Sequence, residues 1–283
     1  MLILLPPSEG KTAPARGKAM QPDRLSFPSL HSARAKVLDA LVSLCTTGRG
    51  TTGRGTTDRG TTDRGTTGGA GDLDEAVDVL GVGKTLADEV ARNADLASAH
   101  ATRADRVYTG VLYEALDLAS LEGAARRRAT SWVAITSGLF GLVRPSDHIP
   151  AYRLSGDVTL PGIGSVATFW RDQLDDAVRE AAGKGLVVDL RSSTYAAFWR
   201  PETDLARRVV TMRVLHEVDG TRKVVSHFNK ATKGRIVRAV LEDGGNPTSP
   251  KRLAALLSDL GWHVELGAPG RHGTRLDVVV TAL

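Results

Sequence analysis

Cysteine and long apolar runs are scarce in this chain of 283 residues, and both shortages narrow its class. The lone Cys45 cannot form an internal disulfide, which fits a reducing compartment and removes any cysteine cage for zinc or an iron–sulfur cluster. No apolar run approaches the roughly 18 to 20 residues that span a bilayer, and the first residues lack the basic start of a secretion signal. We therefore expect a cytoplasmic protein with no membrane partner.

Familiar catalytic and metal-binding motifs are missing as well. The seven histidines show no His-x-His, His-Glu-x-x-His or Glu-x-x-His spacing, so the sequence predicts no metal site and no cofactor. Acyl transfer has no candidate serine, because no Gly-x-Ser-x-Gly elbow is present. Charge is nearly balanced: 37 Lys and Arg against 32 Asp and Glu leave +5, a mild excess that favours anionic partners without requiring them.

The chain does contain an unusual repeat, TTGRGTTGRGTTDRGTTDRGTTGGAG, at residues 46–71. Almost nothing in it is apolar, so it cannot bury enough surface to offset the entropy lost on ordering. We predict a flexible insertion between two helices. Its arginines could contact nucleic acid, but its aspartates reduce the charge and no aromatics interleave, so we favour a repeat expansion without a function.

The remaining sequence has the composition of a globular protein, and we expect one domain over residues 1–283. Short β-branched runs predict strands at 1–5, 131–137, 185–190, 208–215, 223–228 and 275–283. Helical patterns lie at 32–45, 72–80, 84–96, 166–182, 233–244 and 250–261. Together they predict a mixed α/β (α+β) fold with a central mixed sheet of about five or six strands flanked by helices.

The stretch LGVGKTLADEV at 80–90 combines glycines with a lysine and a threonine, as phosphate-binding loops do. A P-loop would need a glycine at position 78 and a strand before it, whereas Asp78 stands there and a helical run precedes it. The P-loop interpretation therefore fails. The spacing of apolar residues and glycines over 72–96 fits a helix-hairpin-helix element instead.

In such an element, glycines let backbone N–H groups approach a phosphate at the start of the second helix. The residues that would contact the phosphate are Gly81, Gly83, Lys84 and Thr85. However, residues 72–96 hold seven acidic side chains against two basic ones, and that charge opposes DNA binding. A structural corner between two helices is therefore an equal alternative.

Polar residues also follow several predicted strands, where ligands gather in sheets. If these loops converge, they form a cationic cleft for a phosphate, a nucleotide or a nucleic-acid strand. Its cations would be Lys11, Arg144, Arg153, Lys230 and Lys233. Glu9 and Asp189 would be counter-charges, and Asp189 or Tyr195 could perform acid–base chemistry. Ordinary solvated loops are the alternative.

Six segments of the chain share the order and spacing of one family, apart from the repeat. They are MLILLPPSEGKT, VYTGVLYEALD, ITSGLFGLVRPSDHIPAYRL, TFWRDQL, VVDLRSSTYAAFW and VVSHFNKATKGRIVRAVLEDG. Together they resemble the YaaA family of peroxide-stress proteins. The resemblance implies a cytosolic protein that helps cells survive hydroperoxide by lowering free intracellular iron, which limits oxidative damage to DNA. It also implies duplex DNA binding through a helix-hairpin-helix within an α/β fold of unusual topology.

The resemblance carries no established catalytic residue, so only matched motif positions become candidates. These are Lys11, Tyr108, Ser137, Gly138, Gly141, Arg144, Pro145, Tyr152, Arg153, Asp189, Ser192, Tyr195, Lys230 and Lys233. The leading hypothesis is a non-enzymatic stress protein that binds duplex DNA through its phosphates without sequence preference. The rival is an enzyme acting on a nucleotide or nucleobase-like anion. Direct iron sequestration is disfavoured by the missing ligand spacing.

Overall fold

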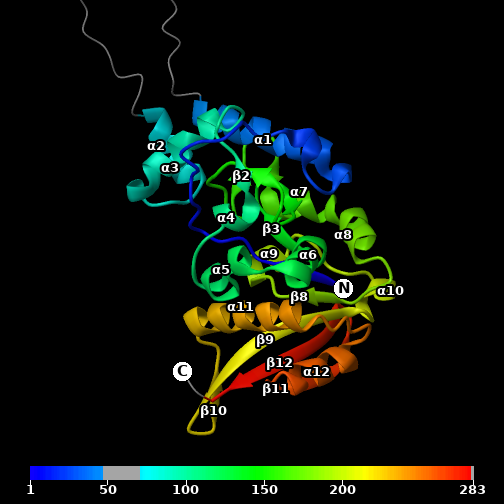
Figure 1. The fold of residues 1–283 in the computed structure, drawn as a ribbon. Coiled ribbons are helices and arrows are strands. Elements are labelled where there is room, and N and C mark those ends of the chain that lie inside the picture. Colours follow the sequence, from blue (N-terminus) through cyan, green and yellow to red (C-terminus); the bar gives the residue numbers. More distant parts are fainter. Residues whose placement is uncertain (47–70, 282–283) are drawn as a thin grey trace, which may run out of the picture.

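The computed structural model describes residues 1–46 and 71–281, and a large mixed sheet runs through this part of the chain (Figure 1). The sheet has eight strands in the order β11-β12-β9-β8-β1-β3-β4, with β10 paired to β9. Its strands are β1 (Leu2–Leu5), β3 (Val133–Ser137), β4 (Gly141–Val143), β8 (Val187–Asp189), β9 (Val209–Val218), β10 (Thr221–Lys223), β11 (His263–Gly270) and β12 (Gly273–Val280). The predicted mixed α/β class is confirmed, with a sheet larger than expected.

The middle of the sheet is parallel, and this arrangement positions the candidate site. β1 pairs in parallel with β3 on one side and with β8 on the other, and β8 pairs in parallel with β9. All four residues of β1 are buried, as expected of a strand covered on both faces. Because parallel strands end at one edge, the loops after β1, β3 and β8 leave the sheet side by side.

Helices cover the sheet and its ends (Figure 1). They are α1 (His31–Thr46), α2 (Gly71–Val79), α3 (Ala87–Ala91), α4 (Ala104–Val107), α5 (Val111–Leu116), α6 (Gly123–Trp132), α7 (Val166–Arg171), α8 (Leu174–Ala182), α9 (Ser193–Ala196), α10 (Thr203–Ala206), α11 (Ser226–Asp243) and α12 (Pro250–Asp259). Single 3₁₀ turns are η1 (Pro22–Arg24), η2 (Pro28–Leu30), η3 (Lys84–Leu86), η4 (Arg92–Asp95) and η5 (Leu118–Ser120). Two-residue ribbons pair β2 (Thr102–Arg103) with β5 (His148–Ile149) and β6 (Thr159–Leu160) with β7 (Gly164–Ser165).

Helix α11 packs closely against α5, and Gly234 is the contact point. A Cβ placed on Gly234 would overlap the backbone oxygen of Leu112, far inside van der Waals contact. Glycine therefore serves here for close approach of two helices, because its own backbone conformation needs no left-handed φ. This contact ties the middle of α11 to α5.

Several predicted elements differ from the observed ones. The strand predicted at 223–228 is wrong, because β10 ends at Lys223 and α11 begins at Ser226. The β-branched pair at 224–225 suits a strand locally, but it lies between β10 and α11 and belongs to neither. The helix predicted at 84–96 is divided into η3, α3 and η4, and the one at 166–182 into α7 and α8. Most of the predicted insertion at 46–71 lies outside the described residues.

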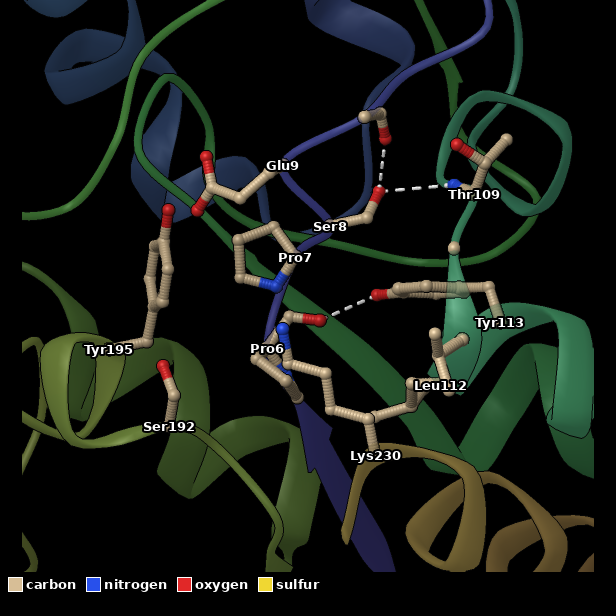
Figure 2. A pocket seen from close by; sticks show the side chains of 13 residues that line it. Pro6, Pro7, Ser8, Glu9, Thr109, Leu112, Tyr113, Ser192, Tyr195 and Lys230 are labelled. Atoms are coloured by element: carbon tan, nitrogen blue, oxygen red, sulfur yellow. Dashed lines mark hydrogen bonds between the residues drawn. The ribbon is translucent and has the colours of Figure 1, made fainter. Parts of the chain in front are cut away.

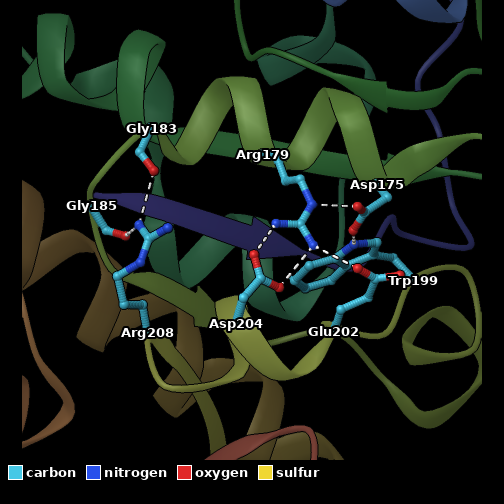
Figure 3. A network of polar contacts seen from close by, with 8 residues as sticks. All are labelled: Asp175, Arg179, Gly183, Gly185, Trp199, Glu202, Asp204 and Arg208. Atoms are coloured by element: carbon cyan, nitrogen blue, oxygen red, sulfur yellow. Dashed lines mark hydrogen bonds and ion pairs between the residues drawn. The ribbon is translucent and has the colours of Figure 1, made fainter.

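One network of ion pairs joins α8 to the chain around α10 (Figure 3). Arg179 contacts Asp204 at 2.6 Å and Glu202 at 3.1 Å, and it also donates to Asp175. Asp175 in turn accepts from the Trp199 indole N–H at 2.8 Å. These exposed pairs hold α8 against the segment that follows α9.

A buried arginine on α1, Arg34, anchors this helix to β4 and to the residue before it. Arg34 is 4% exposed and donates to the backbone oxygens of Phe140 at 3.0 Å and Leu142 at 2.7 Å. Burial lowers its pKa to about 10, and the charge of Asp147 partly opposes that shift.

Among the described helices, none is both long and apolar enough to cross a bilayer.

Candidate functional site

A pocket of about 260 Å³ opens where the loops after β1 and β8 meet the start of α5 (Figure 2). It is lined by Pro6, Pro7, Ser8, Glu9, Gly10, Thr109, Gly110, Val111, Leu112, Tyr113, Ser192, Tyr195 and Lys230. We call it the strand-end pocket. These residues come from four distant segments of the sequence, and the loops after the parallel strands β1 and β8 meet α5 and α11 at the carboxyl edge of the sheet.

Two tyrosines stand on opposite sides of the strand-end pocket, with two prolines between them (Figure 2). The Tyr113 hydroxyl donates to the backbone oxygen of Pro6 at 2.6 Å, and its ring stacks on Tyr108 at a centroid distance of 5.5 Å. Burial raises the pKa of Tyr195, and the negative charge of Glu9 adds to the shift. The pocket therefore has rigid walls made of rings, with neutral phenols at physiological pH.

The loop above the pocket is held by Ser8. Its hydroxyl accepts from the backbone N–H of Thr109 at 3.0 Å and donates to the backbone oxygen of Gly10 at 2.5 Å. Glu9, Ser192 and Lys230 are exposed at the rim. The rim thus presents a carboxylate, a hydroxyl and an ammonium to solvent, while the walls are mainly rings.

Lys11 lies beneath this loop in a cluster with Tyr108, Tyr152 and Ser137, which we call the tyrosine cluster. Its ammonium donates to the backbone oxygen of Ser8 at 2.9 Å and sits 4.5 Å from the centroid of the Tyr152 ring. The Tyr152 hydroxyl is 3.0 Å from that of Tyr108 and 2.7 Å from the hydroxyl of Ser137. The hydroxyls form a buried chain, and the ammonium lies over the faces of the tyrosine rings.

Burial shifts the pKa values in this cluster in opposite directions. It lowers the pKa of Lys11 to about 8, although the charge of Glu9 partly opposes the shift. It raises the pKa of Tyr108 to about 12, and it raises that of Tyr152 as well. At neutral pH the lysine is therefore mostly charged but gives up its proton far more readily than a surface lysine.

A second cavity, of about 620 Å³, lies between the predicted hairpin and the chain after β5. It is lined by Glu9, Val79, Leu80, Gly81, Val82, Gly83, Leu86, Arg153, Ser155, Asp157, Val158 and Thr159. We call it the hairpin groove. Glu9 lines both cavities, so the hairpin groove and the strand-end pocket meet at this residue.

The hairpin itself is a tight turn between α2 and η3. Gly81 adopts a φ of 62°, in the left-handed region that favours glycine, and its N–H donates to the backbone oxygen of Asp78 at 3.0 Å. Gly81, Gly83, Lys84 and Thr85 are all exposed. Lys84 comes within 3.9 Å of Asp74, a weak exposed pair that leaves the ammonium 83% exposed.

Arg153 links the hairpin groove to the loop after β1. One guanidinium nitrogen donates to the backbone oxygen of Glu9 at 2.7 Å and lies 3.7 Å from its carboxylate. Another lies 3.7 Å from the carboxylate of Glu89 on α3. The arginine is thus shared between two acids, which reduces the positive charge that the groove offers an anion.

Asp189, Lys233 and Arg144 are predicted site residues that line neither cavity. Asp189 is buried and accepts two side-chain bonds from Arg191, at 2.9 and 2.7 Å. Lys233 donates to the backbone oxygen of Leu190 at 3.1 Å. Arg144 lies at the other end of β3, where it donates to the backbone oxygen of Val133 at 2.9 Å and packs on Phe27. The structure therefore does not bring Arg144 into the predicted cleft.

Arg191 explains the position of Asp189. Burial opposes ionisation of Asp189, but the charge and hydrogen bonds of Arg191 overcome it and hold the pKa of the carboxyl below its ordinary value. Arg191 also donates to the backbone oxygens of Tyr195 at 3.0 Å and Trp199 at 2.9 Å. The pair therefore fixes the wall of the strand-end pocket that carries Tyr195.

The sequence prediction did not select Thr109, Gly110 or Tyr113 as site residues. They follow a buried β-bridge between Lys11 and Tyr108, which only the folded chain displays. The signal available in the sequence was the cluster YTGVLY at 108–113, where two aromatic residues flank a glycine.

Within the described residues, no three His, Cys, Asp or Glu side chains gather in a way that could hold a metal ion.

The fold and these cavities define a class: a mixed α/β protein with a ring-walled pocket at the carboxyl edge of its sheet and a glycine hairpin beside it. Residues 67–266 match the family described as peroxide stress protein YaaA. The chain is 49% identical to a UPF0246 protein of Streptomyces coelicolor over 99% of its own length and 98% of the relative. It is also 37% identical to one of Corynebacterium efficiens over 99% of this chain and all of the relative. The chain belongs to the YaaA family of peroxide stress proteins.

Proposed function

We propose that this protein acts in the cytosol under peroxide stress and protects DNA by binding the duplex through its phosphates, while limiting free iron. Membership of the family supports the peroxide-stress role. The observation that carries DNA binding is the exposed turn between α2 and η3. It presents two glycines, Gly81 and Gly83, and the side chain of Lys84, which is 83% exposed, at the edge of the hairpin groove.

The turn is suited to a phosphate for steric reasons. No atom lies within 4 Å of the place where a Cβ on Gly81 would be, so a phosphate can approach the backbone there. Arg153 stands on the groove, and Lys230 stands at the rim of the adjoining pocket. Acidic residues around the hairpin offset part of this charge, so we expect modest affinity driven by counterion release.

The decisive measurement is fluorescence anisotropy with two unrelated duplexes at two salt concentrations. We expect similar affinities for both sequences and a steep loss of affinity as salt rises, because phosphate contacts carry no sequence information. Strong discrimination between the duplexes, or no binding at low salt, would contradict the proposal.

A pair of matched lysine variants localises the contact. Lys84→Ala should weaken binding to every duplex and reduce the slope of log affinity against log salt by about 1, because one phosphate contact is lost. Lys251→Ala is the control: this exposed lysine opens α12, on the opposite side of the molecule from the hairpin (Figure 1). Equal losses from both variants would mean that net charge, and not the hairpin, sets the affinity.

The iron-limiting part of the proposal concerns the whole cell. A strain lacking the protein should accumulate more chelatable iron after hydroperoxide treatment, measured by electron paramagnetic resonance of chelated iron. Re-expression of the wild-type chain should restore the lower level. Unchanged iron with unchanged survival would contradict this part and leave DNA binding to be judged by anisotropy.

The tyrosine cluster favours a second candidate, an enzyme that acts on a nucleotide or nucleobase-like anion. Lys11, with a pKa of about 8, donates to the backbone oxygen of Ser8 in the pocket lining, and such a group can exchange a proton near neutral pH. Tyr195→Phe tests this candidate because it removes one oxygen from the pocket wall. Loss of peroxide protection with unchanged folding and DNA affinity would favour the enzyme.

A further inference from the structure

The strand-end pocket and the hairpin groove form one continuous surface. They share Glu9, whose backbone oxygen and carboxylate both face Arg153 of the groove. A strand whose phosphates rest on the hairpin would therefore pass the mouth of the pocket. The fold places a small cavity directly beside the proposed backbone contact.

The size of the pocket limits what can enter it. Its volume of about 260 Å³ lies just below the roughly 300 to 1,000 Å³ of pockets for drug-sized ligands. A single flat ring system fits such a space better than a whole nucleotide cofactor does. Because the pocket also opens at its rim, the remainder of a larger ligand can stay outside.

The walls of the pocket match the faces of a nucleobase. Tyr113 and Tyr195 stand on opposite sides, and Pro6 and Pro7 lie between them (Figure 2). Aromatic and apolar side chains stack on unstacked bases with little regard to sequence. Tyr113 is fixed by its bond to Pro6, so this wall is in place before a ligand arrives.

The rim supplies groups for the edge of a base and for its phosphate. Glu9 offers carboxylate oxygens, which accept from exocyclic amino or ring N–H groups. Thr109 and Ser192 can donate or accept, and Lys230 places a positive charge at the same opening. A neutral flat ring inside and a negative group outside is the charge pattern of a nucleotide within a strand.

We infer that the strand-end pocket receives one unstacked nucleobase from DNA held along the hairpin groove. The inference rests on the proposed DNA binding. It makes DNA with an unpaired or damaged base the preferred partner, because such a base costs least to withdraw from the duplex. Paired duplex then binds through phosphates alone.

Three duplexes of one sequence test the inference by anisotropy: fully paired, with one adenine opposite an abasic site, and abasic on both strands at that position. The duplex with the unpaired adenine should bind about tenfold more tightly than either of the others, because its base is free to enter the pocket. The doubly abasic duplex separates base capture from a preference for flexible DNA. Equal affinities for the adenine and doubly abasic duplexes would overturn the inference.

Two neighbouring serines provide matched variants. Ser192→Tyr adds a ring to the pocket from an exposed position, so it should abolish the tenfold preference. Ser193→Tyr adds the same ring at an exposed residue that does not line the pocket, and it should retain the preference. Identical behaviour of the two variants would also overturn the inference. Failure of the wild-type chain to bind any duplex would instead end the proposed function itself.

Discussion

At the scale of single residues, Lys11 and Asp189 show that the pKa of a buried charged group depends on its partner. The ammonium of Lys11 has ring faces and a backbone oxygen as partners, so burial lowers its pKa to about 8. The carboxylate of Asp189 has a bidentate arginine, which holds its pKa low despite burial. The first group can change its charge near neutral pH, and the second cannot.

The lowered pKa of Lys11 predicts a pH dependence of stability. Between pH 8 and 10 the unfolded chain holds a proton on Lys11 that the folded chain has released, so the free energy of unfolding should rise with pH in this window. The rise attributable to Lys11 should be about 2 kcal/mol and should disappear in Lys11→Met, as measured by urea unfolding at several pH values. Above pH 10 the raised pKa of Tyr108 acts in the opposite sense, so the window ends there. A wild-type slope retained in Lys11→Met would contradict this assignment.

Asp189→Asn should destabilise the fold by about 3 kcal/mol, because it leaves the buried guanidinium of Arg191 without its counter-charge. It should also loosen Tyr195, whose backbone oxygen accepts from Arg191. Urea unfolding measures the first effect, with Asp157→Asn as a control at an exposed carboxylate of the hairpin groove. A loss below about 1 kcal/mol, typical of surface changes, would show that the pair contributes little.

At the scale of elements, the packing of α11 on α5 connects the C-terminal half of the chain to the pocket. α5 supplies Val111, Leu112 and Tyr113 to the pocket wall, and α11 supplies Lys230 to its rim. The two helices touch through Gly234. The geometry of the pocket therefore depends on a contact that involves no pocket side chain.

Gly234→Ala tests this dependence. The new Cβ would fall on the Leu112 backbone, which cannot move as a flexible side chain can, so we expect a loss of about 1 to 3 kcal/mol in unfolding free energy. Thermal unfolding measures it, with Arg235→Ala as a control at the adjacent exposed position. An unchanged or raised melting temperature would mean that the helices separate at no cost and that the contact is not tight in solution.

At the scale of the whole molecule, the sheet joins segments from both ends of the chain. β12 lies between β11 and β9 and pairs with β9 in parallel over Thr274–Val280. Leu276 and Val278 are fully buried there. The last strand of the described residues is therefore an interior strand of the sheet.

Removal of residues 271–283 should prevent cooperative folding. The loss of buried Leu276 and Val278 alone costs about 1.5 to 3 kcal/mol each, a large part of the roughly 5 to 15 kcal/mol that stabilises a domain. Near-UV circular dichroism and solubility measure the effect, and removal of residues 282–283 alone is the control. A truncated chain with a native near-UV spectrum would show that β12 is dispensable.

Sequence reasoning predicted most of the central strands because buried β-branched runs are a local signal. It missed β4 and β11, whose sequences include glycine and, in β11, also proline, and it extended the strand at 223–228 into what is the first turn of α11. Local propensity cannot decide such cases, because tertiary packing determines which backbone groups find partners. The breaks within the helices predicted at 84–96 and 166–182 were not predicted, for the same reason.

The sequence by itself determined the mixed α/β class and the family, since each depends on residues close together along the chain or on motif order. The tertiary structure alone decided which polar residues share a cavity. Arg144 and Ser192 both follow strands, yet they lie at different places because β4 runs back along β3 whereas β8 runs parallel to β1. Strand direction is set by pairing across the sheet, and no single segment of sequence contains that information.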